Sequence, residues 1–230
     1  MLQKYLIIFM AGGIVGLDTT AAWQILISHP LISSTIIGWI FGDLSLGLFF
    51  GLVMELLWMK DVPVGGAKFP EGNIGSLVGI STIILIQPKG ALQNPVLVLL
   101  GLLYGFLLAH LIGYTILRMR RNNLIFVHWA DNFAEKGNAA GVAWMHRLGV
   151  FHTFAHGAIW TVLTVWIGTL LLDWICRLPL SWLNLSILHI KYTFLGVGIG
   201  VIGYYYTGRK NRSILIVGLC IGLLIGILWR

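Results

Sequence analysis

The sequence predicts an all-α polytopic membrane protein, with several spanning helices plus broken or re-entrant helices in its N-terminal half. The chain has 230 residues, of which 58% are hydrophobic and only 10% are charged. An ordinary soluble domain carries roughly 25% charged residues, so this chain cannot cover a single core with a wettable surface. Several of its apolar runs reach the roughly 20 residues that a membrane-spanning helix needs.

The positive charges lie in short gaps between the apolar runs. Lys and Arg total 15 against 8 Asp and Glu, which gives a formal net charge of +7. The positive-inside rule accounts for this distribution, so we expect a lipid bilayer around the chain and no nucleic-acid partner. Cys176 and Cys220 both lie in apolar stretches and form neither a metal motif nor a disulfide framework.

The first apolar segment covers residues 1–28 and begins, like a cleaved signal peptide, with one Lys before an apolar run. Its apolar character continues past Asp18 with no small-residue cleavage pattern, so we interpret it as a retained first membrane segment. Four later runs have the length of ordinary spans, namely residues 96–117, 148–172, 192–208 and 213–229.

Three apolar pieces between residues 31 and 86 are too short to be comfortable spans. Residues 31–42 stop at Asp43, residues 44–54 stop at Glu55, and residues 74–86 follow a break rich in Gly and Pro. Runs of 10 to 14 residues are typical of re-entrant or half-spanning helices. We therefore expect broken helices enclosing a polar cavity.

The break itself covers residues 62–75 and reads VPVGGAKFPEGNIG. Irregular backbone at membrane depth is tolerated only inside protein or beside a wet cavity, and transporters place substrate sites at such breaks. A plain extramembrane loop is the alternative, because Lys60, Asp61 and Lys68 would suit one equally well.

A second break, residues 118–147, is the only long polar stretch. Its five basic residues outnumber its two acids, which predicts a cytoplasmic location. Within it, Phe126, Ala130, Phe133 and Ala134 share a helical face, as in an amphipathic interfacial helix. A further basic cluster, residues 209–212, is expected on the same side.

We find no soluble domain and no convincing internal repeat. The expected organisation is one membrane domain over residues 1–230 in a bacterial cell (inner) membrane, crossed several times. It would comprise a broken-helix substrate region (1–90), the cytoplasmic amphipathic segment (118–147) and C-terminal helices (148–230).

Asp18, Asp43 and Glu55 each interrupt apolar sequence, and a carboxylate at bilayer depth costs about 2.5 to 3.5 kcal/mol on insertion scales. Asp18 and Asp43 would serve as helix N-caps, or would join a polar cavity that binds a polyhydroxylated ligand or a coupling proton. Glu55 has apolar neighbours on both sides, which disfavours capping and favours a role in the cavity.

His152 and His156 stand four residues apart, as two metal ligands on one helix face would. No third ligand follows at a defined spacing, so we interpret them as hydrogen-bonding histidines and expect neither metal nor cofactor. The chain has no GxxxxGK[ST] loop and so does not itself hydrolyse ATP in the P-loop manner. Trp58, three residues after Glu55, would either pack in the core or stack on a sugar ring.

Several motifs carry a resemblance to a known family. They are GLD (16–18), HPL (29–31), GWIFGD (38–43), GLVMEL (51–56), VGG (64–66), FPE (69–71) and the block ADNFAEKGNAAGVAWMHRLGVFHTF (130–154). In this pattern the chain resembles the membrane subunit IIC of the mannose/fructose/sorbose family of the bacterial phosphoenolpyruvate-dependent sugar phosphotransferase system (PTS). Two departures stand out: His29 replaces the family's usual Arg, and Phe69-Pro70-Glu71 replaces Pro-Pro-Asp or Pro-Pro-Asn.

The resemblance implies a permease subunit that moves a hexose across the membrane, coupled to phosphorylation of the sugar by a phosphohistidine on IIB. Its partners would be a IID membrane subunit and cytoplasmic IIA and IIB, with IIC-IID pairs forming a homo-oligomer. No catalytic residue is expected here, and the enzyme class stays open. The substrate-binding residues are predicted to be Glu55, Asp18, Gln24, Glu71, Asn73 and Trp58.

Two other functions remain open. Broken helices fit a secondary transporter or the membrane subunit of an ATPase-coupled permease equally well. A degenerate IIC homologue retained as an assembly scaffold is the third possibility.

Overall fold

The computed structural model describes residues 1–59, 69–179 and 185–206, together with the single positions 213, 216, 217 and 220. Within these ranges the chain is all-helical, with one short 3-10 turn and no strand. The helices are α1 (Leu2–Thr20), α2 (Pro30–Phe41), α3 (Leu44–Trp58), α4 (Gly72–Ile86), η1 (Ala91–Gln93), α5 (Pro95–Glu135), α6 (Ala139–Cys176) and α7 (Ile187–Tyr206). The predicted helical fold class is confirmed.

The short apolar pieces form the short helices α2, α3 and α4, as predicted. Pro30 opens α2, and Gly42 closes it in the left-handed conformation at φ 85°. Asp43 then caps α3 by accepting a hydrogen bond from the Leu46 N–H at 3.1 Å. The prediction that Asp43 is an N-cap is therefore confirmed, whereas Glu55 does not end its helix, which continues to Trp58.

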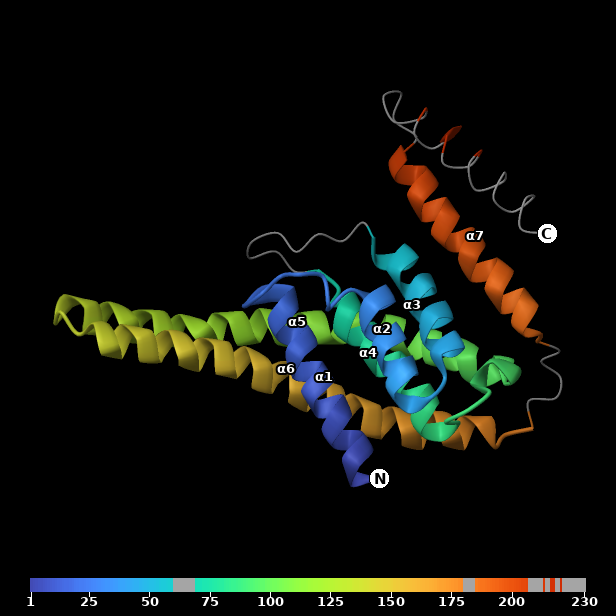
Figure 1. Ribbon diagram of the computed structural model, residues 1–230, viewed down its shortest axis with the longest axis horizontal. Helices are drawn as coiled ribbons and strands as arrows, with labels where there is room; N and C mark the ends of the chain where they lie inside the picture. Colours follow the sequence, from blue (N-terminus) through green and yellow to red (C-terminus); the bar gives the residue numbers. More distant parts are fainter. Residues whose placement is uncertain (60–68, 180–184, 207–212, 214–215, 218–219, 221–230) are drawn as a thin grey trace.

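Helices α5 and α6 form a long antiparallel hairpin that projects well beyond the other helices (Figure 1). At about 1.5 Å per residue, 41-residue α5 and 38-residue α6 are each about 60 Å long. Both are long and apolar enough to cross a membrane. The turn between them carries Gly137 at φ 66° and Asn138, whose side chain accepts from the Gly141 N–H at 2.9 Å.

The predicted break at residue 118 is wrong, because α5 runs through it to Glu135 without interruption. The interfacial face assigned to this segment also has a different role. Phe126 packs edge-on against His152 with ring centroids 6.0 Å apart. Phe133 occupies the space that a Cβ on Gly141 would need. Both aromatic side chains therefore pack against α6.

Helix α4 lies at the centre of the fold, with nearly every residue buried between α2, α5 and α6. Helix α1 crosses α6 where Gly12 and Gly16 meet Gly157: a Cβ on Gly157 would lie 2.5 Å from the Gly12 carbonyl oxygen. Small residues permit this close approach of two helices inside a membrane.

Helix α7 packs on α3, and the Lys191 ammonium lies 5.7 Å from the centre of the Phe49 ring. It covers most of the predicted span at residues 192–208. The predicted span at 213–229, the basic cluster at 209–212 and the loop at 60–68 lie outside the described residues, apart from four single positions of the last span.

Candidate functional site

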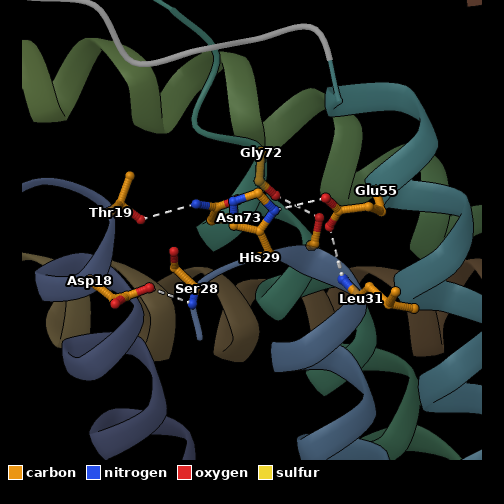
Figure 2. A network of polar contacts seen from close by, with 9 residues as sticks. Asp18, Thr19, Ser28, His29, Leu31, Glu55, Gly72 and Asn73 are labelled. Carbon is orange, nitrogen blue, oxygen red and sulfur yellow. Dashed lines mark hydrogen bonds and ion pairs between the residues drawn. The ribbon is translucent and has the colours of Figure 1, made fainter. Parts of the chain in front are cut away.

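A cavity of about 430 Å³ lies where the end of α1, the starts of α2 and α4 and the end of α3 come together. Its lining includes all six predicted site residues, which come from three stretches of the sequence. The lining residues are Asp18, Thr19, Gln24, Leu26, Ser28, His29, Pro30, Glu55, Trp58, Met59, Phe69, Pro70, Glu71, Gly72 and Asn73. Figure 2 shows Asp18, Thr19, His29, Glu55 and Asn73 converging on this region.

Asp18 lies in the last turn of α1 and is 3% exposed. Its two carboxylate oxygens accept hydrogen bonds from the backbone N–H groups of Ile25 and Ser28, both at 2.8 Å. The alternative that Asp18 is an N-cap is therefore wrong, because it stands at the wrong end of its helix. Its carboxylate instead fixes the loop that follows.

That loop, residues 21–29, is the reason why α1 ends earlier than the predicted segment 1–28. Trp23, Gln24 and Leu26 all adopt positive φ, at 65°, 51° and 71°. Each such residue costs roughly 1 to 3 kcal/mol and persists only where its surroundings hold it. The two backbone hydrogen bonds to the Asp18 carboxylate stabilise this strained loop. They keep Gln24 and Leu26 in the cavity wall.

Glu55 projects from α3 across to the start of α2. Its Oε1 lies 2.8 Å from Nδ1 of His29, and its Oε2 accepts from the Leu31 N–H at 3.2 Å (Figure 2). The expectation that Glu55 faces a polar cavity is met by this geometry. The contact with His29 is a full ion pair only when the imidazole is protonated.

Glu71 stands directly before α4, where its backbone N–H donates to the Ala109 carbonyl of α5 at 2.8 Å. Its side chain is 1% exposed, and neither carboxylate oxygen has a hydrogen-bond partner within the described residues. Asn73, in the first turn of α4, donates to Thr19 Oγ1 at 3.1 Å and so ties α4 to the end of α1. The Arg120 charge, the Thr19 side chain and the Ile74 backbone favour the charged form of the Glu71 carboxylate. A hydroxyl-bearing ligand would add the close hydrogen bonds that its buried oxygens lack.

Trp58 packs in the core as well as lining the cavity. Its ring stacks on Phe106 with centroids 5.2 Å apart and an interplanar angle of 18°, and Gly72 leaves room for its other side. Its indole N–H is buried without a partner in the described part of the chain. The indole edge, rather than an open ring face, is what Trp58 offers a ligand.

His152 and His156 are not joined by a third metal-binding side chain, and the described residues contain no cluster of three potential ligands. His152 Nδ1 lies 2.6 Å from Asn123 Oδ1, which agrees with the predicted hydrogen-bonding role for this histidine.

The sequence analysis did not predict that Thr19, Ser28 and His29 line the cavity. Thr19 follows Asp18 directly, and Ser28 lies two residues before Pro30. These positions could have indicated both residues, but the sequence analysis had treated this stretch as helix. His29 was noted as a departure from the family pattern, but nothing in the sequence identified Glu55 as its partner.

The fold and site together define a class: a helical membrane protein with a carboxylate-lined cavity among short, broken helices. The model of the family described as the sorbose-specific IIC component of the PTS matches residues 1–227. The chain therefore belongs to this family.

Individual relatives share only part of their length with this chain. The sorbose-specific EIIC component of Lacticaseibacillus casei is 27% identical over 143 residues, 62% of this chain and 48% of that protein. The fructose permease IIC component of Bacillus subtilis (strain 168) is 30% identical over 118 residues, 51% of this chain and 41% of that protein. The matched region thus spans about half the length of these relatives.

Among solved structures, a complex of the mannose transporter ManYZ with microcin E492 contains a chain of the same fold. The TM-score is 0.64 at 18% sequence identity, over 100% of this chain and 95% of that chain. This similarity supports the fold.

Proposed function

We propose that this chain is the sugar-translocating IIC subunit of a mannose-family PTS permease, embedded in a bacterial inner membrane by several spans. The observation that carries the proposal is the convergence of three carboxylates, Asp18, Glu55 and Glu71, on one cavity inside an apolar protein. Carboxylates bond strongly to hydroxyl groups, and the volume lies in the range of small-molecule sites, roughly 300 to 1,000 Å³.

In this function the chain binds and positions the sugar, and another subunit supplies the phosphoryl group. A IIB phosphohistidine gives up its phosphoryl group as the N–P bond breaks, a sugar hydroxyl oxygen forms the new P–O bond, and the hydroxyl proton passes to the freed histidine nitrogen. Holding the hexose in place contributes to the rate by orientation alone. IIA, IIB and IID are the proposed partners, with IIC-IID pairs assembling into a homo-oligomer.

The test compares Glu55→Gln with Asp43→Asn in the complete permease reconstituted in proteoliposomes. Glutamine keeps the size of the side chain but weakens charge-assisted hydrogen bonds, so uptake and phosphorylation of the sugar should fall sharply. Asp43 caps α3, and Asn caps almost as well, so this control should retain most of its uptake. Equal defects at equal protein levels would contradict the assignment. Uptake driven by an ion gradient without IIB would identify a secondary transporter.

The exposed hairpin end at residues 118–147 is proposed to face the cytoplasm and to dock IIB. Its excess of basic residues would attract a phosphorylated, more anionic partner, chiefly by raising the encounter rate. Arg120 is unsuitable for testing this, because its guanidinium lies 5.1 Å from the centre of the Phe69 ring in the cavity wall. Arg121 and Arg147 are exposed. Their double replacement by Gln should raise the IIB concentration for half-maximal phosphorylation at low salt; an unchanged value would refute the docking role.

A further inference from the structure

A second cavity lies between α5 and α6, away from the carboxylate cavity. It has a volume of about 390 Å³ and is lined by polar, basic and aromatic side chains of the two helices and by one methionine. They are Tyr114, Thr115, Arg118, Met119, Asn122, His152, His156 and Trp160. The proposed sugar site uses none of them, and we call this cavity the hairpin groove.

The polar groups of the hairpin groove suit an anion. Arg118 is exposed and makes no hydrogen bond or ion pair within the described part of the chain. His156 Nε2 is buried and likewise has no hydrogen-bond partner among the described residues. His152 is held by Asn123 through Nδ1, which leaves the other ring nitrogen for the groove. No Asp or Glu lines the groove.

The groove also lies at a particular depth. The charge-free run of α5 ends at residue 117, and Arg118 is the first charge after it. From Pro95 this run extends about 35 Å along the helix, close to the ~30 Å hydrocarbon thickness of a bilayer. Tyr114 and Trp160 flank the groove at this level, and these residue types concentrate at membrane interfaces.

Apolar side chains continue the groove toward the bilayer. On α5, Leu107 and Leu111 share a face with Tyr114 and Arg118 by helical spacing, and both are about 60% exposed. On α6, Leu163 and Ile167 extend the line of His156 and Trp160 and are also exposed. Helix α1 contacts α6 at Gly157, which does not line the groove.

We propose that the hairpin groove binds an anionic phospholipid, with its phosphate beside Arg118 and an acyl chain along the exposed leucines of α5 and α6. A basic pocket between helices at the membrane surface is suited to such a headgroup. A free phosphate or sugar phosphate shares the headgroup chemistry. The apolar continuation of the groove favours the lipid, because a free anion would not contact the exposed Leu and Ile side chains.

The test measures lipid binding to the purified chain by native mass spectrometry. Phosphatidylglycerol and phosphatidylcholine with identical acyl chains are titrated against the unmodified chain, Arg118→Gln and Arg147→Gln. Arg147 is exposed on α6, outside the groove, and carries the same charge. Arg118→Gln should weaken phosphatidylglycerol binding roughly fivefold, the effect of one basic residue near an anionic lipid. Arg147→Gln and all phosphatidylcholine affinities should be unchanged.

Two further measurements separate the alternatives. Arg118→Lys keeps the charge and should restore binding, which excludes misfolding of the Gln variant as the cause. Inorganic phosphate and glycerol phosphate at millimolar concentration should not displace the lipid. Displacement by either anion would identify a site for soluble phosphate, and an equal loss in Arg118→Gln and Arg147→Gln would show general charge attraction. Either result would overturn the proposal.

Discussion

Replacing Gly157 with Ala tests how tightly the site is supported by the crossing of α1 over α6. A Cβ at this position would lie 2.5 Å from the Gly12 carbonyl oxygen and 3.1 Å from the Gly16 Cα. Both contacts are with backbone, so no change of rotamer relieves them and the helices must move apart. Helix α1 carries Asp18 two residues beyond Gly16, so this movement also displaces the cavity wall.

Gly149 provides a matched control on the same helix. A Cβ there would meet only Phe126 Cδ2, at the ordinary distance of 3.9 Å. Both substitutions gain the same helix propensity, about 0.8 to 1.0 kcal/mol for Gly to Ala. The difference between the two variants therefore isolates the clash, which overpacking data place at about 1 to 3 kcal/mol.

The assay is thermal unfolding of the detergent-purified chain, followed by tryptophan fluorescence. For a chain of this size, a difference of about 2 kcal/mol corresponds to roughly 4 to 8 °C in Tm. We expect Gly157→Ala to unfold that much earlier than Gly149→Ala. Equal midpoints, or a higher one for Gly157→Ala, would refute the close contact of the two backbones.

Three other predictions concern the cavity wall and the hairpin. Asp18→Asn loses one charged hydrogen bond worth about 1.5 to 3 kcal/mol. Hydrogen exchange in residues 21–29 should therefore accelerate roughly 10- to 100-fold. Unchanged exchange would show that Asp18 does not restrain this loop. Leu26 is at φ 71°, which suits Gly better than a β-branched residue, and its side chain is mostly exposed. Leu26→Gly should therefore keep or increase the protection of this loop from hydrogen exchange, and Leu26→Val should reduce that protection. With both cysteines replaced by serine, Lys136→Cys should label only from the cytoplasmic side of sealed vesicles; labelling from the other side would reverse the proposed topology. Lys136 is preferable to Gly137, whose φ is 66°.

The parts of the fold that depend on local patterns were predictable from the sequence. Short apolar lengths and a capping Asp43 indicated α2 and α3, because a cap is a contact within one turn. The cavity was predicted for a similar reason: a carboxylate amid apolar residues, such as Glu55, is costly at bilayer depth unless it faces a polar space.

The parts that depend on distant contacts were not predictable. The early end of α1 results from a carboxylate that bonds N–H groups seven and ten residues further along the chain. Helix α5 continues through a cluster of basic residues because α6 lies alongside it, and charge patterning alone indicated a break there. The partnership of His29 and Glu55 joins residues 26 positions apart.

The contact between His29 and Glu55 also affects how tightly this cavity can bind a ligand. Glu55 and His29 already bond to each other, so in the proposed function a sugar that binds to Glu55 would replace this hydrogen bond instead of adding one. The net gain is then the small difference between two sets of bonds. For the proposed permease such weak holding is an advantage, because a loosely bound sugar is released easily.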